Sequence, residues 1–241
     1  MHDDLGDRMK SQYENRTRYL LPRRTYTIIR IDGKAFHSYT KDLNKPFDED
    51  LINDMNQTTI ELCKNIQGSK FGFVQSDEIS ILLTDFETIN TDAWFDGNIQ
   101  KIVSVSASIA TSSFNLLRLE RYLNQNVLFG FAKKQAQFDS RVLVIPDPIE
   151  VENYFIWRQK DAVRNSISMV AQSLYSHKQL NCKSQSDMQE MCFQKGVNWN
   201  DMPDGFKRGR TIIKEENWVI KTPDFLKERN ILTSLIPKIM L

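Results

Sequence analysis

The stretch Thr25-Tyr26-Thr27-Ile28-Ile29-Arg30-Ile31-Asp32-Gly33 is rich in β-branched and aromatic residues and ends in an Asp-Gly pair. A run of this kind, bounded by a turn dipeptide, predicts a buried β-strand that ends at Asp32. Asp32 has an ordinary explanation, because Asp-Gly is a common turn pair after a strand. It also has a functional one, because Gly33 allows the backbone to approach a ligand closely. Which explanation holds depends on the elements that follow.

Five further elements are expected along the first part of the chain. Apolar residues recur at helical spacing in two segments, and three short segments have the composition of strands. These elements are a helix at 48–65, strands at 71–75 and 79–83, a helix at 99–117 and a strand at 141–145. Together with the first strand they give the order βαββαβ, the split βαβ arrangement of ferredoxin-like domains, in which the first strand lies beside the third. The sequence therefore predicts an α+β fold with the helices on one face of the sheet.

The composition of the chain changes after residue 146. A capping pattern that begins at Asp147 predicts a long helix that reaches about residue 177. Residues 181–210 are polar and contain turn signals, and the last 30 residues look partly extended and peripheral. We therefore expect a first part with the βαββαβ order and a C-terminal helical and irregular extension that packs as one unit with it. Their ranges are 1–146 and 147–241.

Overall composition indicates an ordinary globular protein. Of 241 residues, 40% are hydrophobic and 26% are charged, and the net charge is +1. No run approaches the roughly 18 apolar residues that span a bilayer, and the first residues do not resemble a secretion signal. The expected location is the cytoplasm, without membrane association. The cysteines are widely spaced and indicate neither a disulfide framework nor a zinc site; they are Cys63, Cys182 and Cys192.

The acidic motif Gln75-Ser76-Asp77-Glu78 lies in the expected connection between the second and third strands. In the βαββαβ arrangement this connection meets the end of the first strand at one edge of the sheet. The carboxylates of Asp32 and Asp77 and the carbonyl of Gly33 would there supply hard oxygen ligands for Mg²⁺. Close carboxylates without a cation would repel each other, which disfavours a purely structural role. The pattern predicts phosphoryl chemistry that uses two Mg²⁺ ions.

Several basic or polar residues are candidates for contacts with a triphosphate. Lysine and arginine neutralise the charge of a phosphoryl group during transfer, but each can equally be a solvated surface charge. The candidates near the carboxylates are Lys34, His37, Lys45 and Ser76, and those further off are Lys101 and Arg141. His37 can be a packing or base-contacting residue as well as a proton shuttle. Phe71 and Phe73 suggest either a nucleic-acid platform or, as is more common, core residues.

Two segments of the second half are candidate RNA contacts. On the long helix, polar residues at helical spacing can face either solvent or the active site. These residues are Arg158, Asp161, Arg164 and Asn165. A basic loop around Lys207 and Arg208 can contact a phosphate backbone or simply be solvated. Residues 151–241 carry a small positive balance and residues 1–150 a small negative one, which suits a metal site beside a polyanion path.

In combination and in order, these motifs resemble the tRNA-histidine guanylyltransferase family of reverse (3′-to-5′) polymerases. No single motif is specific, but the ordered set spans roughly residues 25–210. The matching stretches are Arg30-Ile31-Asp32-Gly33-Lys34-Ala35-Phe36-His37, Lys45-Pro46, Gln75-Ser76-Asp77-Glu78, Phe138-Asp139-Ser140-Arg141-Val142, Tyr154-Phe155-Ile156-Trp157-Arg158-Gln159-Lys160-Asp161, Asn198-Trp199-Asn200-Asp201 and Lys207-Arg208-Gly209.

The resemblance implies a polymerase-type palm, usually assembled as a homotetramer, that acts on tRNA and nucleoside triphosphates. It implies that Asp32, the Gly33 carbonyl and Asp77 hold two Mg²⁺ ions, with Glu78 as a third catalytic residue. ATP activates a 5′-monophosphorylated end, and the 3′-OH of an incoming nucleotide such as GTP then attacks it. The implied nucleotide-binding residues are Asp32, Gly33, Lys34, Ala35, Phe36, His37, Lys45, Ser76, Asp77 and Arg141.

One departure from the family pattern concerns the substrate. In the eukaryotic guanylyltransferases a His-Ile-Asn-Asn-Leu-Tyr-Asn stretch follows the Trp-Arg-Gln helix start, whereas this chain has Val163-Arg164-Asn165-Ser166-Ile167-Ser168-Met169. Only Asn165 is retained. This resembles the bacterial and archaeal-type "like proteins", which are associated with templated repair of 5′-truncated tRNA. The leading hypothesis is therefore a template-dependent 3′-to-5′ nucleotidyltransferase.

Three other functions remain open at this point. A tRNA-histidine guanylyltransferase, which adds an extra 5′ G, would share the active site. A nucleotide cyclase uses two carboxylates on the same topology and needs no RNA. A non-catalytic RNA-binding module would not require Asp32, Asp77 and Glu78 together.

Overall fold

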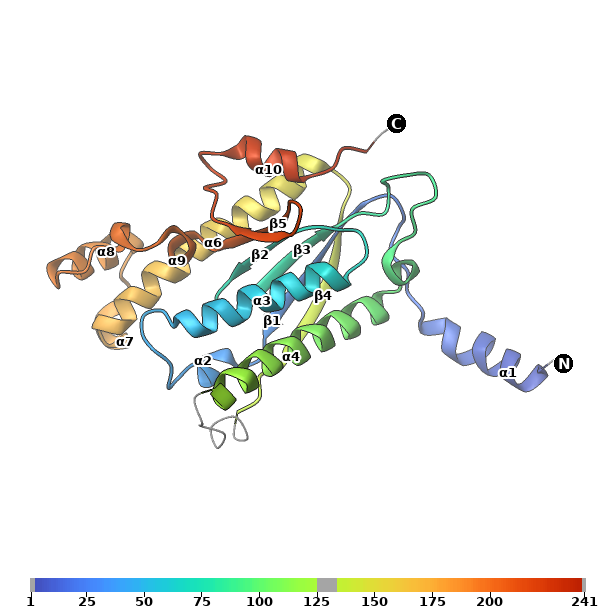
Figure 1. Ribbon diagram of the computed structural model, residues 1–241, viewed down its shortest axis with the longest axis horizontal. Helices are drawn as coiled ribbons and strands as arrows, with labels where there is room; N and C mark the ends of the chain where they lie inside the picture. Colours follow the sequence, from blue (N-terminus) through green and yellow to red (C-terminus); the bar gives the residue numbers. More distant parts are fainter. Residues whose placement is uncertain (1–2, 125–133, 240–241) are drawn as a thin grey trace.

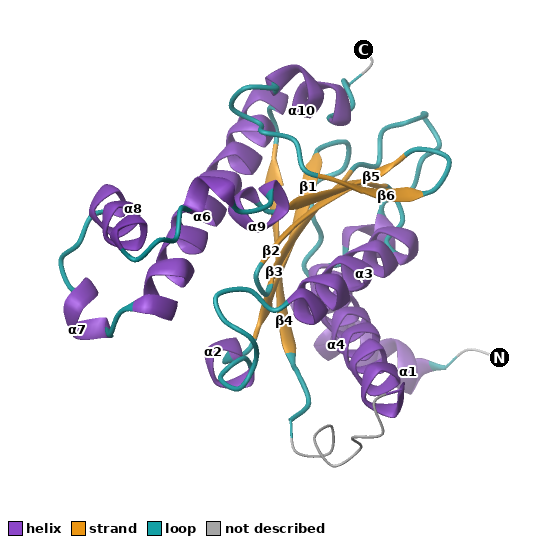
Figure 2. Cartoon of the chain, turned by 60° about the vertical axis from the view of Figure 1, so that its left-hand side comes forward, coloured by secondary structure: helices purple, strands orange, loops and turns teal. Residues whose placement is uncertain are grey.

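The computed structural model describes residues 3–124 and 134–239, which form a six-stranded antiparallel sheet with helices on both faces (Figures 1 and 2). The strand order is β4-β1-β3-β2-β5-β6. The first four strands have the expected ferredoxin-like order, with β1 between β4 and β3, which confirms the α+β prediction. The strands are β1 Tyr26–Gly33, β2 Ser69–Gln75, β3 Glu78–Leu83, β4 Phe138–Ile145, β5 Arg210–Lys214 and β6 Trp218–Lys221.

Two helices cover one face of this sheet, as the sequence predicts for the palm (Figure 2). α3 (Glu49–Asn65) begins at the expected cap, since the Asp48 carboxylate accepts a hydrogen bond from the Leu51 amide. α4 (Ile99–Asn124) is longer than predicted. Odd-numbered residues of β1, such as Ile29, pack against both helices in one buried cluster. Because successive side chains of a strand alternate between faces, the even-numbered residues of β1 face the other way.

The opposite face is covered by α6 (Pro148–Leu174), the long helix predicted in the second half. Ile28 of β1, Phe71 and Phe73 of β2, and Phe155 of α6 share a second buried cluster. Phe71 and Phe73 are almost fully buried, so they are core residues and the aromatic-platform interpretation is wrong. The sheet therefore has helices on both faces, and α6 of the extension completes the core of the palm.

The cap of α6 gives a first testable prediction. The Asp147 carboxylate accepts hydrogen bonds from the amides of Ile149 at 2.7 Å and Glu150 at 3.2 Å. Asp147→Ala removes both bonds and should cost about 1 kcal/mol, which lowers Tm by roughly 2–4 °C in a chain of this size. Thermal unfolding measures the shift. Asp147→Asn keeps an acceptor oxygen and should retain most of the stability; equal losses in the two variants would contradict the capping role.

The remaining helices are short. They are α1 Asp4–Met9, η1 Lys10–Glu14, η2 Asn15–Thr17, α2 Phe36–Tyr39, η3 Trp94–Gly97, α7 His177–Leu180, α8 Gln185–Gln194, η4 Trp199–Asp201, α9 Asp204–Arg208 and α10 Arg229–Leu235. α1, η1 and η2 project from the body (Figure 1) and bury no residue.

Residues 181–210, in which the sequence showed only polar residues and turn signals, contain a helix. α8 lies there, and its start carries a capping box in which Ser184 and Asp187 bond each other's backbone amides. The end of the chain is also less peripheral than expected. β5 pairs with β2, and Phe225 and Leu232 are fully buried. β5 thus extends the sheet beyond β2, and the residues that follow it pack in the buried cluster beneath α6.

α4 is the one helix in the described part of the chain that is long and apolar enough to cross a membrane. Its buried residues, among them Ala110 and Phe114, pack in the same cluster as the β1 strand and α3. A core helix of a globular fold passes the same test of length and composition.

Candidate active site

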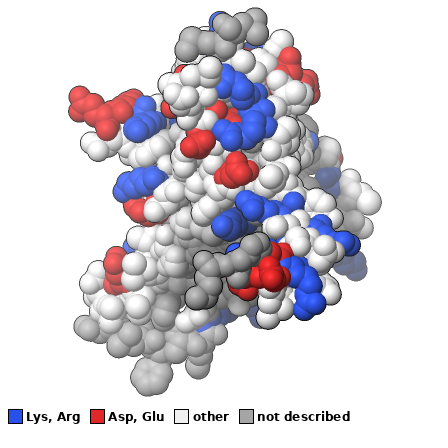
Figure 3. Space-filling view, turned by 90° about the vertical axis from the view of Figure 1, so that its right-hand side faces the viewer, with Lys and Arg blue, Asp and Glu red and all other residues white. Residues whose placement is uncertain are grey.

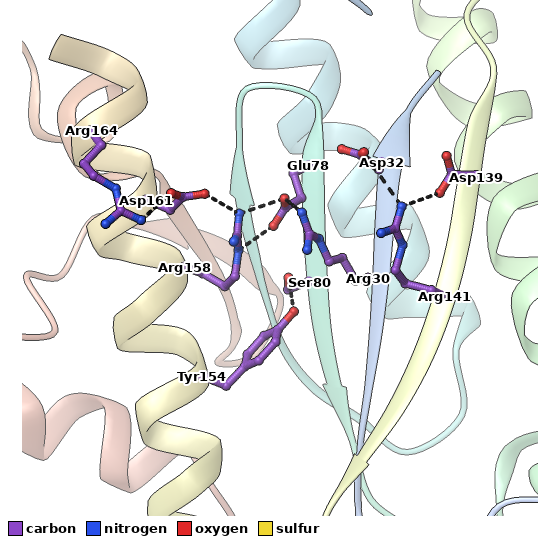
Figure 4. Close-up of polar contacts among 10 residues, drawn as sticks. All are labelled: Arg30, Asp32, Glu78, Ser80, Asp139, Arg141, Tyr154, Arg158, Asp161 and Arg164. Atoms are coloured by element: carbon purple, nitrogen blue, oxygen red, sulfur yellow. Dashed lines mark hydrogen bonds and ion pairs between the residues drawn. The ribbon is translucent and has the colours of Figure 1, made fainter. Parts of the chain in front are cut away.

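Three acidic residues form a row across β4, β1 and β3. Asp32 is the direct register partner of Asp139 on one side and of Glu78 on the other. Directly paired residues of antiparallel strands point to the same face, so the three carboxylates share the face that α6 covers. Arg30 and Arg141 lie two residues from Asp32 and Asp139 along the same strands, so they form a second row on this face. Figure 4 shows both rows.

Asp77 reaches the same edge through a tight turn. Glu78 pairs with Gln75, so the connection contains two residues, Ser76 and Asp77, rather than the three that the sequence suggested. Ser76 takes a left-handed backbone conformation with φ of 50°. The Gly33 amide donates to the Asp77 carbonyl at 3.2 Å, and this bond ties the turn to the end of β1. The predicted meeting of the Asp32 and Asp77 motifs is confirmed.

The Asp77 carboxyl is in an environment that disfavours its charge. Burial raises the pKa of Asp77 to about 6, a hydrogen bond from Ser76 opposes this, and the charges of Asp32 and Glu78 add to it. Crowding of carboxylates in a buried position is the arrangement that a bound cation relieves.

The raised pKa of Asp77 predicts that the folded protein becomes more stable when the charge of this side chain is removed. The folded-state pKa of Asp77 lies above its ordinary value of 3.8, so the unfolded chain releases its proton first as pH rises. The free energy of unfolding therefore decreases between about pH 4 and pH 6 and stays lower above pH 6. In the presence of a chelator, Asp77→Asn should stabilise the protein at pH 7.5 by about 1–3 kcal/mol and have little effect at pH 3.5. Equal unfolding free energies of variant and parent at pH 7.5 would contradict this.

Glu78 is held by two arginines rather than open to a metal. Its carboxylate pairs with Arg30, and Arg158 contacts both carboxylate oxygens, at 2.6 Å through Nε and 2.7 Å through Nη2. Burial raises the pKa of Glu78, and the charges of Arg158 and Arg30 oppose that rise. Glu78 therefore fixes the start of β3 and connects it to α6, immediately after Asp77.

The polar residues of α6 extend this network away from the sheet. Arg158 also pairs with Asp161 at 3.1 Å, and Asp161 pairs with Arg164 at 2.6 Å (Figure 4). The Tyr154 hydroxyl bonds the Ser80 hydroxyl of β3 at 3.1 Å in the buried layer beneath. The sequence left open whether the polar residues of α6 face solvent or the active site. Arg158 faces the active site, whereas Arg164 and Asn165 are exposed.

The segment after β1 contains several of the predicted nucleotide-binding residues. Ala35 has a left-handed conformation with φ of 52°, and Phe36 is buried among Tyr39, Phe114 and Phe138. A Cβ on Gly33 would lie 2.2 Å from the Phe36 ring. Gly33 is therefore required for this ring to pack beneath the segment, and the Phe36 side chain supports the site rather than lining it.

The exposed polar side chains of this segment have only weak local partners. The Lys34 ammonium donates to the Gln137 side chain at 3.0 Å, and the Lys45 ammonium to the Thr40 carbonyl at 3.0 Å. His37 lies 3.0 Å from the Ser38 hydroxyl. These neutral partners are easily exchanged for phosphate oxygens.

The two more distant candidates differ in their positions. The Arg141 guanidinium lies beside the carboxylate row, 3.1 Å from Asp139 and 4.0 Å from Asp32. Lys101 is on the first turn of α4, over the Phe95 ring, on the other face of the sheet from the carboxylates. Within one chain, the structure does not bring Lys101 to the site, and its contact with nucleotide stays a prediction.

The basic loop at 207–208 is more constrained than the sequence suggested. The Lys207 ammonium is turned inward, donates to the Asn200 carbonyl at 2.8 Å and lies over the Trp199 ring. Arg208 pairs with Asp204 and, at 3.2 Å, with Asp224. Both cations are neutralised locally, and their RNA contact also stays a prediction. On the face in Figure 3, basic side chains gather in small groups with acidic ones beside them, so that face is of mixed charge.

The sequence left two residues of the site unassigned, Arg30 and Asp139. A signal for Arg30 was present, because it stands two residues before Asp32 and so shares its face in a strand. Asp139 could be placed only with the register of β4 against β1. Among the described residues no group of three or more His, Cys, Asp or Glu side chains is arranged to hold a metal. Two carboxylates and a carbonyl still suit Mg²⁺, which completes its shell with water and phosphate oxygens.

Comparisons with known proteins agree with this geometry. The model of the tRNAHis guanylyltransferase family matches residues 6–146, more than half of the chain. A bacterial tRNA(His) guanylyltransferase (Thg1)-like protein in complex with ATP is 47% identical with a TM-score of 0.89, and the match covers 97% of this chain and 99% of that one. A bacterial protein of the same description in complex with GTP is 43% identical with a TM-score of 0.80, at the same coverage.

More distant relatives extend the similarity to eukaryotes. The probable tRNA(His) guanylyltransferase of Dictyostelium discoideum is 28% identical over 209 residues, which cover 81% of this chain and 78% of that protein. The similarity thus reaches beyond residue 146 and into the extension. The chain belongs to the tRNAHis guanylyltransferase family, whose members are nucleotidyltransferases.

Proposed function

We propose that this enzyme adds nucleotides in the 3′-to-5′ direction to the 5′ end of 5′-truncated tRNA, with the opposite strand as template. The observation that carries the proposal is the Asp32–Asp77 pair at one sheet edge, in a chain 47% and 43% identical to bacterial guanylyltransferase-like proteins that bind ATP and GTP. The loss of the histidine-containing stretch at 163–169 supports repair over dedicated modification of tRNA-histidine.

Asp32, the Gly33 carbonyl and Asp77 would hold Mg²⁺, and two ions are expected. The donors are hard oxygens, and the burial of Asp77 beside the charges of Asp32 and Glu78, which together raise its pKa, favours a cation between them. When bound, Mg²⁺ supplies positive charge that stabilises the transferring phosphoryl group. Glu78 keeps its two arginines and holds Asp77 in position.

The other residues of the site would bind and orient the triphosphate. Ser76 lies in the turn, Lys34 and Lys45 lie in the segment after β1, and Arg141 approaches from β4. In the first step, ATP activates a 5′-monophosphate and pyrophosphate leaves; in the second, the 3′-OH of the incoming nucleotide attacks the activated phosphate and AMP leaves. For both steps the site must align a nucleophile, a phosphorus and a leaving group, which is the main contribution of a protein to phosphoryl transfer.

The test is extension of a 5′-truncated tRNA by the purified protein with Mg²⁺ and all four nucleoside triphosphates. Labelled tRNA should lengthen by the missing nucleotides, and each should complement the opposite strand. A mismatched template base should redirect the choice of nucleotide. Absence of extension on both 5′-monophosphorylated and 5′-triphosphorylated tRNA would refute the proposal.

A second candidate is addition of the extra 5′ G to tRNA-histidine, the activity for which the eukaryotic relatives are named. The two activities differ in their use of a template. Equal rates of G addition opposite C and opposite A at the position before the first nucleotide would favour this candidate. A cyclic product from ATP or GTP without RNA would instead indicate a cyclase. A homotetramer and a cytoplasmic location complete the proposal; light scattering measures the first.

A further inference from the structure

Asp139 is a carboxylate of the site that the proposed function leaves without a role. It is the register partner of Asp32 on β4, and its side chain points to the same face of the sheet (Figure 4). More than half of its side-chain surface is exposed. An acid beside a polyanion substrate is unfavourable unless it serves another group, and the contacts of Asp139 identify that group as Arg141.

Arg141 lies between two carboxylates but is bound more closely by one of them. Its Nη2 atom lies 3.1 Å from Asp139, within hydrogen-bond distance, and 4.0 Å from Asp32. An arginine guanidinium is always charged in a protein, and in the metal-free state Asp139 and Asp32 together hold that of Arg141 at the edge of the carboxylate row.

A cation at Asp32 changes this balance. A divalent ion bound there reverses the local field, so Asp32 no longer attracts the guanidinium and the ion repels it. The Arg141 side chain is also half-exposed, and a free arginine side chain gains considerable rotamer entropy. Asp139 is then the carboxylate that keeps Arg141 beside the metal, where the phosphates of a nucleotide lie.

We propose that Asp139 is a positioning residue that anchors the Arg141 guanidinium next to the metal-binding edge, so that it meets the triphosphate preorganised. This inference rests on the proposed function, because it assigns triphosphate binding to Arg141. Asp139 itself touches neither substrate nor metal in this role. Its effect is on nucleotide affinity and passes through Arg141.

The experiment compares nucleotide binding and metal binding in a double-mutant cycle. Affinities for GTP are measured calorimetrically with Ca²⁺, and affinities for Mn²⁺ alone by electron paramagnetic resonance. The variants are Asp139→Ala, Arg141→Ala and the double variant, with Asp139→Asn as a shape-conserving alternative. The matched control is Asp92→Ala, which removes a more exposed aspartate 3.8 Å from another arginine, Arg23, far along the chain from the site.

Asp139→Ala should weaken GTP binding by roughly tenfold, the effect of one charge-assisted contact, and leave Mn²⁺ affinity within twofold of the parent. In the Arg141→Ala background the Asp139 substitution should add nothing. Asp92→Ala should change neither affinity. Asp139→Asn should fall between Ala and the parent, because its amide oxygen still accepts a hydrogen bond.

Three results would overturn the inference. Unchanged GTP affinity in both Asp139 variants would show that Arg141 needs no anchor. Losses that add in the double variant would show that Asp139 acts independently of Arg141. A fivefold or larger loss of Mn²⁺ affinity would make Asp139 a metal ligand. The proposed function fails separately, when the parent protein binds GTP but does not extend truncated tRNA.

Discussion

Replacing Asp32 or Asp77 with alanine is expected to lower the rate of 5′-nucleotide addition by on the order of 10³-fold or more. Each carboxylate supplies oxygen ligands to the proposed Mg²⁺ site, and the remaining residues cannot replace them, because both oxygens of Glu78 are held by arginines. The measurement is single-turnover extension of a 5′-truncated tRNA with saturating nucleotide.

Measurements of tRNA binding and thermal unfolding distinguish a catalytic defect in these variants from misfolding. Both variants should bind tRNA like the parent and unfold at a similar or higher temperature, since removal of Asp77 also removes a buried charge. Glu61→Ala removes an exposed acid paired with Lys64 on α3 and should leave the rate unchanged. Turnover within tenfold of the parent in either Asp32→Ala or Asp77→Ala would refute the metal assignment.

The second large effect is expected from Arg158→Ala, and it is an effect on stability. The Arg158 side chain is 5% exposed and pairs with both oxygens of Glu78, which is itself mostly buried. Removal of one partner of a buried ion pair leaves the other charge poorly compensated, at a cost of about 3–5 kcal/mol. Arg30 remains as a second partner, so we expect the lower end of that range, about 3 kcal/mol.

Urea unfolding measures this loss directly, and thermal unfolding should show a decrease of roughly 6–12 °C. Arg164→Ala is the matched control. It removes another arginine of α6 that pairs with Asp161 at 2.6 Å, but the side chain is half-exposed, so the expected cost is below about 1 kcal/mol. Similar losses in the two variants would show that burial of the Glu78 pair contributes nothing.

The fold could be predicted from the sequence where its elements are locally encoded. The strand at 25–33 and the helix after Asp48 follow from composition, spacing and caps within a few residues, and their order led to the position of β1 beside β3. The pairing of β5 with β2 could not be predicted, because it joins segments about 140 residues apart and the short β5 carries a buried arginine, Arg210, that suggests a surface loop.

The same distinction applies to the site. The meeting of Asp32 and Asp77 followed from strand order alone. The partners of Glu78 did not, because Arg158 is 80 residues away and its direction depends on where α6 crosses the sheet. Lys207 was a candidate phosphate contact with a solvated loop as the alternative, and both require an accessible cation. Its burial follows from the packing of the 198–208 segment against α6, which no local pattern reveals.

The sheet has a consequence for the modularity of the enzyme. β2 forms hydrogen bonds to β3 on one side and to β5, from the end of the chain, on the other. A fragment that stops at residue 146 would leave the backbone of β2 as an open edge and expose Phe71 and Phe73 to water. The proposed catalytic residues Asp32 and Asp77 lie in the first part of the chain, but the sheet that carries them includes β5 and β6 from the last part. The palm therefore depends on the C-terminal part of the chain to complete both its sheet and its core.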